Sequence, residues 1–280
     1  MKKREELKVT TSPIRLMQNF EKILEYCEHG VPTTTSCSKC NPVEIKEPCK
    51  HQRESSGCFE CRAEESHRAW VVEEKAKLES IYANPTEILR SFNVPPKYRP
   101  CSLETFKGND KLINECRKNI GESLVLFGNT GCGKTHLAVA LMREKLQKNI
   151  KDIIAVEWEA ETSRSIKNQL FISVPDLLLE IRNSFNDKAG RTEEEIIDHY
   201  SKIPFLVLDD LGSEKTSEFS ITSLYVIIDR RDRNLKSTIY TTNLSPKEIE
   251  DKLGARIASR LSGMKNIKIN MPDYRKKRGN

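Results

Sequence analysis

From Ser123 onward, the chain alternates short apolar runs with longer segments in which apolar residues recur at helical spacing. The apolar runs are residues 124–127, 170–172, 205–208 and 238–240, and the helical segments that follow them are residues 135–148, 175–186, 217–233 and 246–253. A last strand is predicted at residues 266–270. Continuously apolar strands separated by amphipathic helices indicate a parallel sheet that is covered on both faces. The pattern therefore predicts an α/β domain.

The residues before Ser123 show a different pattern. Between Cys37 and Cys61 there is almost no apolar periodicity, and a charged helix is predicted at residues 63–82. Prolines recur at positions 85, 95, 96 and 100, where they break helices and mark a linker. We therefore expect an N-terminal helical module at residues 1–85, a linker at 86–105 and the α/β domain at 106–280, in which residues 151–168 form an insertion of no assigned role.

A glycine-rich loop follows the strand predicted at residues 124–127. It consists of Gly128, Asn129, Thr130, Gly131, Cys132, Gly133, Lys134 and Thr135. This loop fits the pattern G-x-x-x-x-G-K-[ST], and it lies between a strand and a helix as the pattern requires. Its backbone N–H groups and the helix N-terminus would bind phosphates. Lys134 is expected to reach the β- and γ-phosphates of a nucleotide and Thr135 to bind Mg²⁺; the alternative is a glycine-rich turn that matches by chance.

Two carboxylates follow the apolar run at residues 205–208, namely Asp209 and Asp210. The carboxyl ends of parallel strands form the edge at which open α/β sheets bind their ligands. We expect Asp209 to hold Mg²⁺ and Asp210 to act as the general base that polarises a water molecule. The alternative is a solvated turn.

Polar positions near the C-terminus allow two interpretations. Asn243 follows the strand at residues 238–240. It would face the γ-phosphate if this strand lies between the phosphate-loop strand and the strand that ends in the acidic pair. Otherwise Asn243 caps or turns into the next helix. Arg256 and Arg260 are four residues apart and therefore share a helix face, which by spacing alone is a solvated basic face.

The cysteines of the N-terminal module are arranged as two pairs. Cys37 and Cys40 form one C-x-x-C pair, Cys58 and Cys61 form the other, and 17 residues separate the pairs. This spacing is typical of a four-cysteine Zn²⁺ site, although Cys49 or His51 lies between the pairs and would be an alternative ligand. Unrelated cytosolic thiols are the other explanation. A module of this size would depend on Zn²⁺ for much of its folding free energy.

Together these segments resemble the AAA+ ATPases of the bacterial replicative helicase loaders (DnaC/DnaI type), and they share much with the related transposition helper ATPases (IstB type). The resemblance covers residues 94–275 and rests on the phosphate loop followed by His136-Leu137-Ala138, on Asp209-Asp210-Leu211-Gly212, on Thr241-Thr242-Asn243, and on residues 254–261 and 273–275. It implies an AAA+ P-loop fold with a parallel sheet covered by helices, and a truncated lid because only 37 residues follow Asn243.

The resemblance also implies roles for particular residues. His136 belongs to the nucleotide-binding motif, and Asn243 matches the first sensor. Arg260 matches the arginine finger that enters a neighbouring subunit's site, with Arg256 as second choice, and Arg275 matches a second sensor. Asp210 stands where most AAA+ proteins have Glu, so hydrolysis is expected to be slow. A zinc-bearing N-terminal module favours the loaders over the transposition helpers.

Composition sets the wider expectations. The net charge is +6 and 31% of the residues are charged, which suits a soluble protein that binds nucleic acid only modestly. No apolar run is long enough to span a membrane and no secretory signal is evident, so a reducing cytoplasm is expected, with no membrane partner. The interpretation is an ATP-dependent loader of a hexameric replicative helicase onto single-stranded DNA, which uses ATP, Mg²⁺ and Zn²⁺ and assembles with itself. The alternatives are a transposition helper ATPase, or a zinc-containing DNA-binding adaptor that barely hydrolyses ATP.

Overall fold

The structure is a computed structural model that describes residues 59–107, 109–155, 168–185, 190–214 and 217–274. The chain divides into two compact units, Met1–Glu74 and Lys75–Asn280. Of the first unit, the described part is the beginning of helix α2 (Phe59–Ala83). None of the helices in the described ranges has the length and apolar content that crossing a membrane requires.

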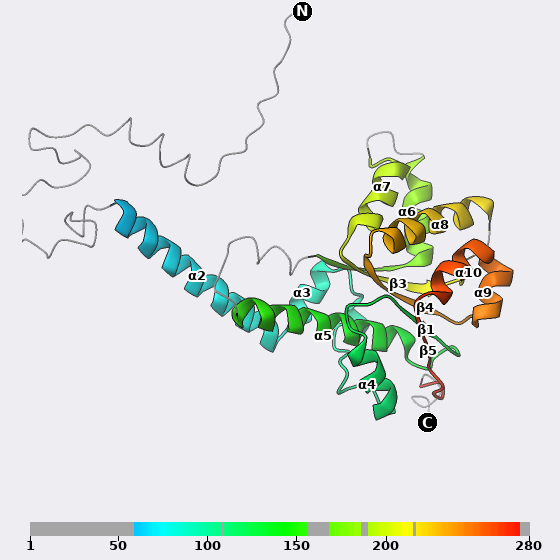
Figure 1. Ribbon diagram of the computed structural model, residues 1–280, viewed down its shortest axis with the longest axis horizontal. Helices are drawn as coiled ribbons and strands as arrows, with labels where there is room; N and C mark the ends of the chain where they lie inside the picture. Colours follow the sequence, from blue (N-terminus) through cyan, green and yellow to red (C-terminus); the bar gives the residue numbers. More distant parts are fainter. Residues whose placement is uncertain (1–58, 108, 156–167, 186–189, 215–216, 275–280) are drawn as a thin grey trace, which may run out of the picture. The chain divides into compact units, whose positions relative to one another are not determined.

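The described residues form a parallel sheet of five strands in the order β2-β3-β4-β1-β5 (Figure 1). The strands are β1 (Leu124–Phe127), β2 (Gln169–Ser173), β3 (Phe205–Leu211), β4 (Ser237–Thr242) and β5 (Lys265–Lys268). The predicted parallel sheet is therefore confirmed. The order also places β4 between β1 and β3, which is the arrangement that a role for Asn243 requires.

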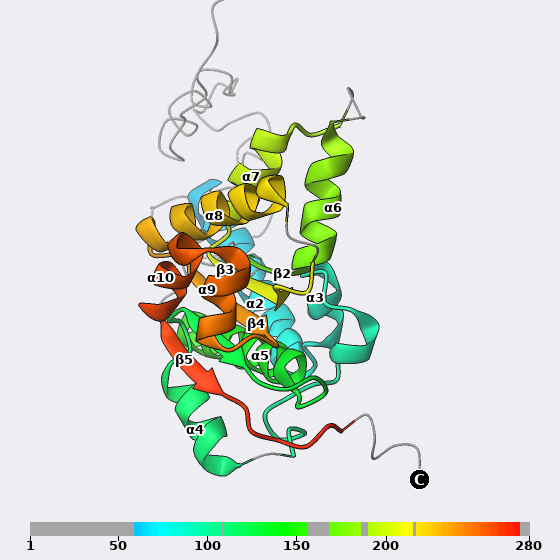
Figure 2. The same ribbon diagram turned by 90° about the vertical axis from the view of Figure 1, so that its right-hand side faces the viewer.

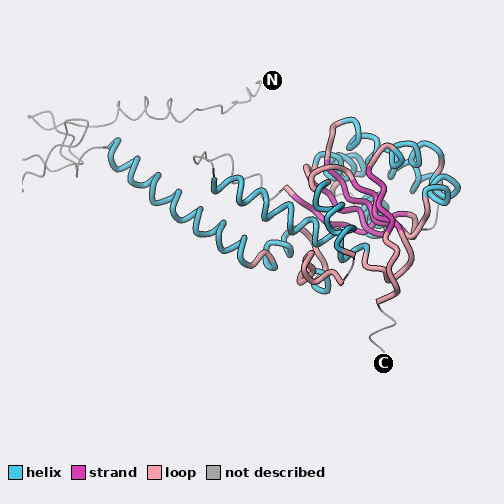
Figure 3. Tube along the Cα trace, turned by 60° about the horizontal axis from the view of Figure 1, so that its bottom comes forward, coloured by secondary structure: helices cyan, strands magenta, loops and turns pink. Residues whose placement is uncertain are grey.

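Helices cover both faces of the sheet. They are α3 (Thr86–Ser91), the short 3-10 helix η1 (Pro96–Tyr98), α4 (Asp110–Lys118), α5 (Lys134–Ala155), α6 (Val174–Ser184), α7 (Glu193–Lys202), α8 (Glu218–Arg233), α9 (Pro246–Leu253) and α10 (Ala255–Ser262). Helices α4 and α5 lie on one side of the sheet, and α6, α7, α8 and α10 lie on the other (Figures 1 and 2). Figure 3 shows the strands, in magenta, between these two layers.

Alternating side chains of the strands build two separate cores. Leu124 and Leu126 of β1 pack into the core that α5 shares, whereas Val125 packs into the core that α6, α7 and α8 share. In the same way, Val207 of β3 faces the first core and Leu206 the second. Successive side chains of a strand point to opposite faces, so strands that are apolar at every position fit a sheet buried on both sides.

Residues 86–105, expected to be a linker, are packed into the first core. Leu89, Phe92 and Val94 are buried there beside Leu124, and the segment contains α3 and η1. Prolines here lie at helix starts instead of breaking helices. Pro85, just before the segment, is the residue that precedes α3, and Pro96 is the first residue of η1. Proline is well tolerated at such positions because its fixed φ suits a first turn.

Candidate functional site

The candidate site lies where the carboxyl ends of β1, β3 and β4 meet. The loop at residues 128–133 connects β1 to the first residue of α5, Lys134. Its geometry depends on glycine at two positions in particular. Gly131 has a φ of +76°, and a Cβ there would collide with the Asp273 carboxylate; Gly133 has a φ of +97°, and a Cβ there would lie 2.9 Å from the Phe106 ring. The loop therefore has no space for side chains at these points.

Lys134 is folded into this loop. Its Nζ donates hydrogen bonds to the Gly128 carbonyl at 3.0 Å, to the Asn129 carbonyl at 2.9 Å and to Asn243 Oδ1 at 2.7 Å. Lys134 is only 5% exposed. The ammonium group is thus surrounded by oxygen acceptors of the protein. One of them comes from the end of β4, so the structure brings Lys134 and Asn243 together.

Asp209 lies beside the phosphate loop and is almost completely buried. It accepts hydrogen bonds from Thr135 Oγ1, at 2.9 and 3.1 Å to its two oxygens, and from Thr241 Oγ1 at 2.6 Å. Burial raises the pKa of Asp209 to about 6, against the opposing effect of these hydroxyl donors. A carboxylate and a hydroxyl in contact are the oxygen ligands that Mg²⁺ binds at such sites, so the donors present fit this ion.

Asp210 lies within strand β3, which was expected to stop at the acidic pair but continues to Leu211. The pairing with β4 shifts between Leu208 and Leu211, and Asp210 has a φ of +58°. Its backbone N–H donates to Thr241 Oγ1 at 2.9 Å. An extra residue in one strand re-aims a side chain, and Asp210 is one of the residues that line the cavity beside the loop.

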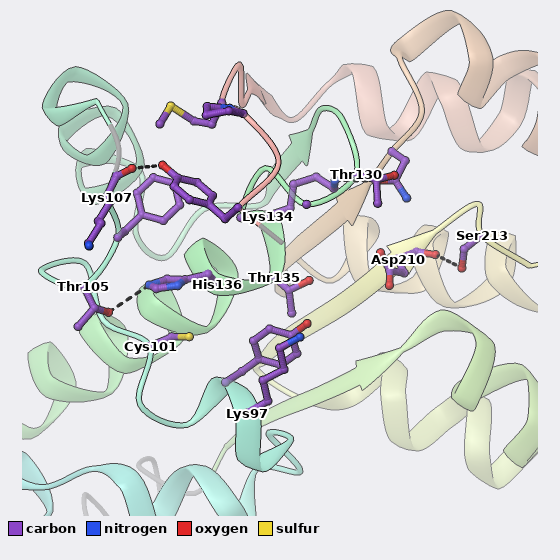
Figure 4. Close-up of a pocket in the computed structure, with 18 residues that line it drawn as sticks. Lys97, Cys101, Thr105, Lys107, Thr130, Lys134, Thr135, His136, Asp210 and Ser213 are labelled. Atoms are coloured by element: carbon purple, nitrogen blue, oxygen red, sulfur yellow. Dashed lines mark hydrogen bonds between the residues drawn. The ribbon is translucent and has the colours of Figure 1, made fainter. Parts of the chain in front are cut away.

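The cavity has a volume of about 840 Å³. Figure 4 shows Thr130, Lys134 and Thr135 on one side of it and Asp210 near the end of strand β3. Half of its lining comes from the segment before β1 and the segment after β5, and most of these residues are apolar or aromatic: Lys97, Tyr98, Cys101, Thr105, Phe106, Lys107, Met271, Pro272 and Tyr274. A space of this size, with a phosphate loop at one end, is large enough for a nucleotide.

His136 connects the phosphate loop to the segment before β1. Its Nε2 lies 3.1 Å from the Ser102 carbonyl and 3.1 Å from Thr105 Oγ1, and its ring meets Phe106 edge to face. Burial lowers the pKa of His136, which favours the neutral form of the ring. The histidine therefore holds one wall of the cavity in place.

Several lining residues were not identified as site residues from the sequence. Phe106 and Met271 carry no chemical signature, because apolar residues near prolines or after a strand are common in any domain. Tyr274 donates a hydrogen bond from its hydroxyl to the Lys107 carbonyl and from its backbone N–H to the Gly131 carbonyl, the latter at 3.1 Å. The segment after β5 thus contacts the phosphate loop directly.

The two candidate finger arginines lie on α10, away from the residues that line the cavity. Arg260 donates to Asp229 Oδ1 from both Nε, at 3.1 Å, and Nη2, at 2.8 Å. Arg256 lies over the Tyr225 ring, 5.8 Å from its centroid. Arg275, the candidate second sensor, lies outside the described residues.

The predicted zinc ligands Cys37, Cys40 and Cys58, and the alternatives Cys49 and His51, also lie outside the described residues, whereas Cys61 falls within α2. Within the described ranges there is no group of three or more side chains suited to a metal. Cys101 and Cys116 are buried, as expected of cysteines that act as small apolar residues.

Comparison with known proteins agrees with this geometry. The "Replicative helicase loader DnaC" of Escherichia coli (strain K12) is 26% identical over 185 residues, which are 61% of this chain and 68% of that protein. A solved structure of the DnaC helicase loader matches with a TM-score of 0.51 at 26% identity, over 63% of this chain and 100% of that one. A structure of DnaI matches with a TM-score of 0.50 at 25% identity, over 63% and 95%.

These matches confirm the α/β AAA+ P-loop fold. Residues 116–277, more than half of the chain, match the family described as IstB-like ATP binding protein. The matched range includes the phosphate loop, the acidic pair and Asn243. The chain belongs to the IstB-like ATP-binding protein family.

Proposed function

We propose that this chain is an ATP-dependent loader that places a hexameric replicative DNA helicase onto single-stranded DNA when replication begins. The observation that carries the proposal is the 26% identity to relatives named replicative helicase loader, which extends over 61% of the chain. The site geometry supports the ATP-dependent part, because a phosphate-loop lysine, a Mg²⁺-compatible pair and a polar strand end meet at one cavity.

ATP would bind with its phosphates on the loop, where Lys134 exchanges its present oxygen partners for phosphate oxygens. Thr135 and Asp209 would hold Mg²⁺, which neutralises charge on the phosphates. Asp210 would orient and deprotonate the attacking water, and His136 would keep the wall of the cavity in position. Asn243 would give up its hydrogen bond with Lys134 and contact the γ-phosphate instead. The end of β4 would therefore respond to the difference between bound ATP and bound ADP.

The partners follow from the same proposal. The N-terminal module, folded around Zn²⁺ by Cys37, Cys40, Cys58 and Cys61, with Cys49 or His51 as the alternative ligand, would contact the helicase. Copies of the chain would assemble on DNA or on the helicase, with Arg260 acting in the site of a neighbour and Arg275 as a second sensor. Single-stranded DNA would bind weakly and in a salt-dependent manner, because a net charge of +6 supports few phosphate contacts.

A second candidate function is a helper ATPase for a transposase, and the family match to IstB-like ATP binding proteins favours it specifically. A third is a zinc-containing DNA-binding adaptor that hydrolyses ATP very slowly. The argument for it is that Asp210 stands where most AAA+ proteins have Glu. These candidates predict different partners for the same nucleotide site.

The test is a loading assay on circular single-stranded DNA with the replicative helicase of the same organism. The wild-type chain should raise the amount of helicase on the circle when ATP is present, and Lys134→Ala should not, because it lacks the phosphate-binding ammonium group. Stimulation of a transposase but not of the helicase would replace the loader by the helper function. Absence of ATP turnover with either partner and DNA would leave the adaptor.

A further inference from the structure

Thr241 connects the two acidic residues of the site. It lies on β4 and is 0% exposed. Its hydroxyl donates to Asp209 Oδ1 at 2.6 Å and accepts the backbone N–H of Asp210 at 2.9 Å. Both hydrogen-bonding capacities of one buried side chain are therefore directed at the acidic pair.

The position of Thr241 in the sheet explains why this contact exists. Leu208 pairs with Tyr240 and Leu211 pairs with Thr242, so Asp209 and Asp210 together face the single residue Thr241. This is a β-bulge, and a bulge leaves a backbone group without its ladder partner. The Thr241 hydroxyl takes the place of that partner for the N–H of Asp210.

The same side chain thus influences both carboxylates. Asp210 has a φ of +58°, a conformation that costs free energy for a residue with a Cβ, and the hydrogen bond from its N–H to Thr241 offsets part of that cost. Asp209 can rotate about its side-chain bonds, and the 2.6 Å bond from Thr241 fixes the oxygen that also meets Thr135.

We propose that Thr241 is a positioning residue for the Mg²⁺–nucleotide site: its hydroxyl orients the Asp209 carboxylate for the metal and holds the bulge that directs Asp210 toward the cavity. This inference rests on the proposed ATP-dependent function and adds to it a residue that touches neither nucleotide nor metal. Removing the hydroxyl should reduce the benefit that Mg²⁺ gives to nucleotide binding, and leave metal-free binding to the loop unchanged.

The chain offers a matched control on the same strand. Thr238 is also 0% exposed, but its hydroxyl accepts from Arg231 Nε at 2.7 Å and donates to the Lys236 carbonyl at 3.1 Å, and it does not line the cavity. Thr238→Val removes a buried hydroxyl from β4 just as Thr241→Val does. Valine keeps the β-branched shape, so each substitution tests the hydroxyl with little change in packing.

The experiment is a titration of the full chain with a fluorescent ATP analogue, once with Mg²⁺ and once with EDTA, together with a thermal melt. The ratio of interest is the affinity for the analogue with Mg²⁺ divided by the affinity with EDTA. In Thr241→Val this ratio should fall about 10-fold, the effect of one hydrogen bond to a charged group. The affinity for the analogue in EDTA should stay at the wild-type value. Thr241→Ser should restore the ratio. Thr238→Val should lower the melting temperature and leave the ratio unchanged.

A wild-type ratio in folded Thr241→Val, or a ratio in Thr241→Ser as low as in Thr241→Val, overturns the inference. If Thr241→Val does not fold, Thr241→Cys replaces it, because a thiol is a weaker donor, and its ratio must lie below that of Thr241→Ser. A wild-type chain that binds no nucleotide at all overturns the proposed ATP-dependent function as well, so the two failures are distinguishable.

Discussion

Among single residues, Asp210 combines an unusual backbone conformation with a proposed chemical role. We predict that Asp210→Asn keeps ATP affinity and loses hydrolysis by about 10²- to 10⁴-fold, because an amide cannot accept the proton of the attacking water. Asparagine tolerates a φ of +58° as well as aspartate does, so the backbone of β3 is preserved. Steady-state turnover and analogue binding, measured on the same preparation, check this.

The comparison variant for this prediction is Asp209→Asn. It should weaken binding in the presence of Mg²⁺, since it alters the proposed metal ligand, whereas Asp210→Asn should not. Survival of wild-type turnover in Asp210→Asn would assign the general base to another residue.

At this scale the sequence revealed the residues that carry a chemical pattern. Lys134, Thr135, Asp210 and Asn243 line one cavity, and Asp209 contacts Thr135 beside it; the phosphate-loop motif and the acidic strand end had singled out all of these except Asn243, whose place was left open. The burial of Lys134 could not be predicted, because it depends on carbonyl groups that only the folded loop brings together. The role of Thr241 was equally hidden, because it follows from the register of two strands and not from spacing along the chain.

Between elements, an ion-pair cluster links α8 to α10. Arg260 on α10 donates to Asp229 on α8, and Arg233 also reaches Asp229, at 2.6 Å. The Arg260 hydrogen bond lowers the pKa of Asp229 below its ordinary value. A lowered pKa in the folded state means that the carboxylate contributes stability above the unfolded pKa, about 3.9, and loses this contribution as the pH falls through the folded value.

We predict that Asp229→Asn lowers the free energy of unfolding at pH 7, and that the difference from wild type shrinks as the pH falls below about 4. Urea unfolding at several pH values measures this. Asp232→Asn is the control. Asp232 is more exposed than Asp229, and its carboxylate lies farther from Arg260, at 3.5 Å from Nε, so its effect on stability should be small. A pH-independent difference for Asp229→Asn would show that lost packing, and not the charge, is responsible.

Element prediction worked where the local signals agreed. Helix α9 has the predicted bounds, Pro246–Leu253, and Ser245 caps it with Glu248 in a capping box. Helix α7 was not predicted, although Thr192 and Glu195 form the same kind of box, because three consecutive glutamates obscure its apolar face. Residues 86–105, expected to be a linker, contain a helix start at Pro96 and core residues such as Leu89 and Phe92, which the prolines alone do not reveal.

For the whole molecule, the finger assignment makes a prediction about assemblies. A finger acts in the neighbour's site and is worth about 10³-fold or more in related phosphoryl transfers. Mixing Arg260→Ala with Lys134→Ala should therefore restore ATPase activity, because one chain supplies an intact phosphate loop and the other an intact arginine. The measurement is turnover across mixing ratios, in the presence of the partner that assembles the subunits.

The contact between Arg260 and Asp229 supplies the competing explanation, in which the arginine only joins α8 to α10 within one chain. Absence of complementation in assemblies shown to contain both variants would favour this structural role. Arg256 would then be tested in the same assay.

The proposed N-terminal zinc module leads to a prediction about the metal content of the protein. Purified full-length protein should carry about one Zn²⁺ per chain, and Cys40→Ser should remove it, because a four-ligand structural site does not tolerate the loss of a thiolate. Metal analysis by mass spectrometry checks this, with Cys116→Ser as the control, since Cys116 is a buried cysteine of the ATPase domain. Freshly reduced wild-type protein without zinc would contradict the module.

The strand order has a further consequence for how the protein is made. β1 lies between β4 and β5, and Leu124 pairs with Ile239 and with Lys265, so its partners are synthesised more than a hundred residues later. Long-range parallel pairing is slow and leaves apolar strands exposed in the meantime. The phosphate loop therefore emerges from the ribosome long before the strands that support it. We therefore expect the growing chain to bind nucleotide only when translation is nearly complete, with the apolar side chains of β1 unpaired until then.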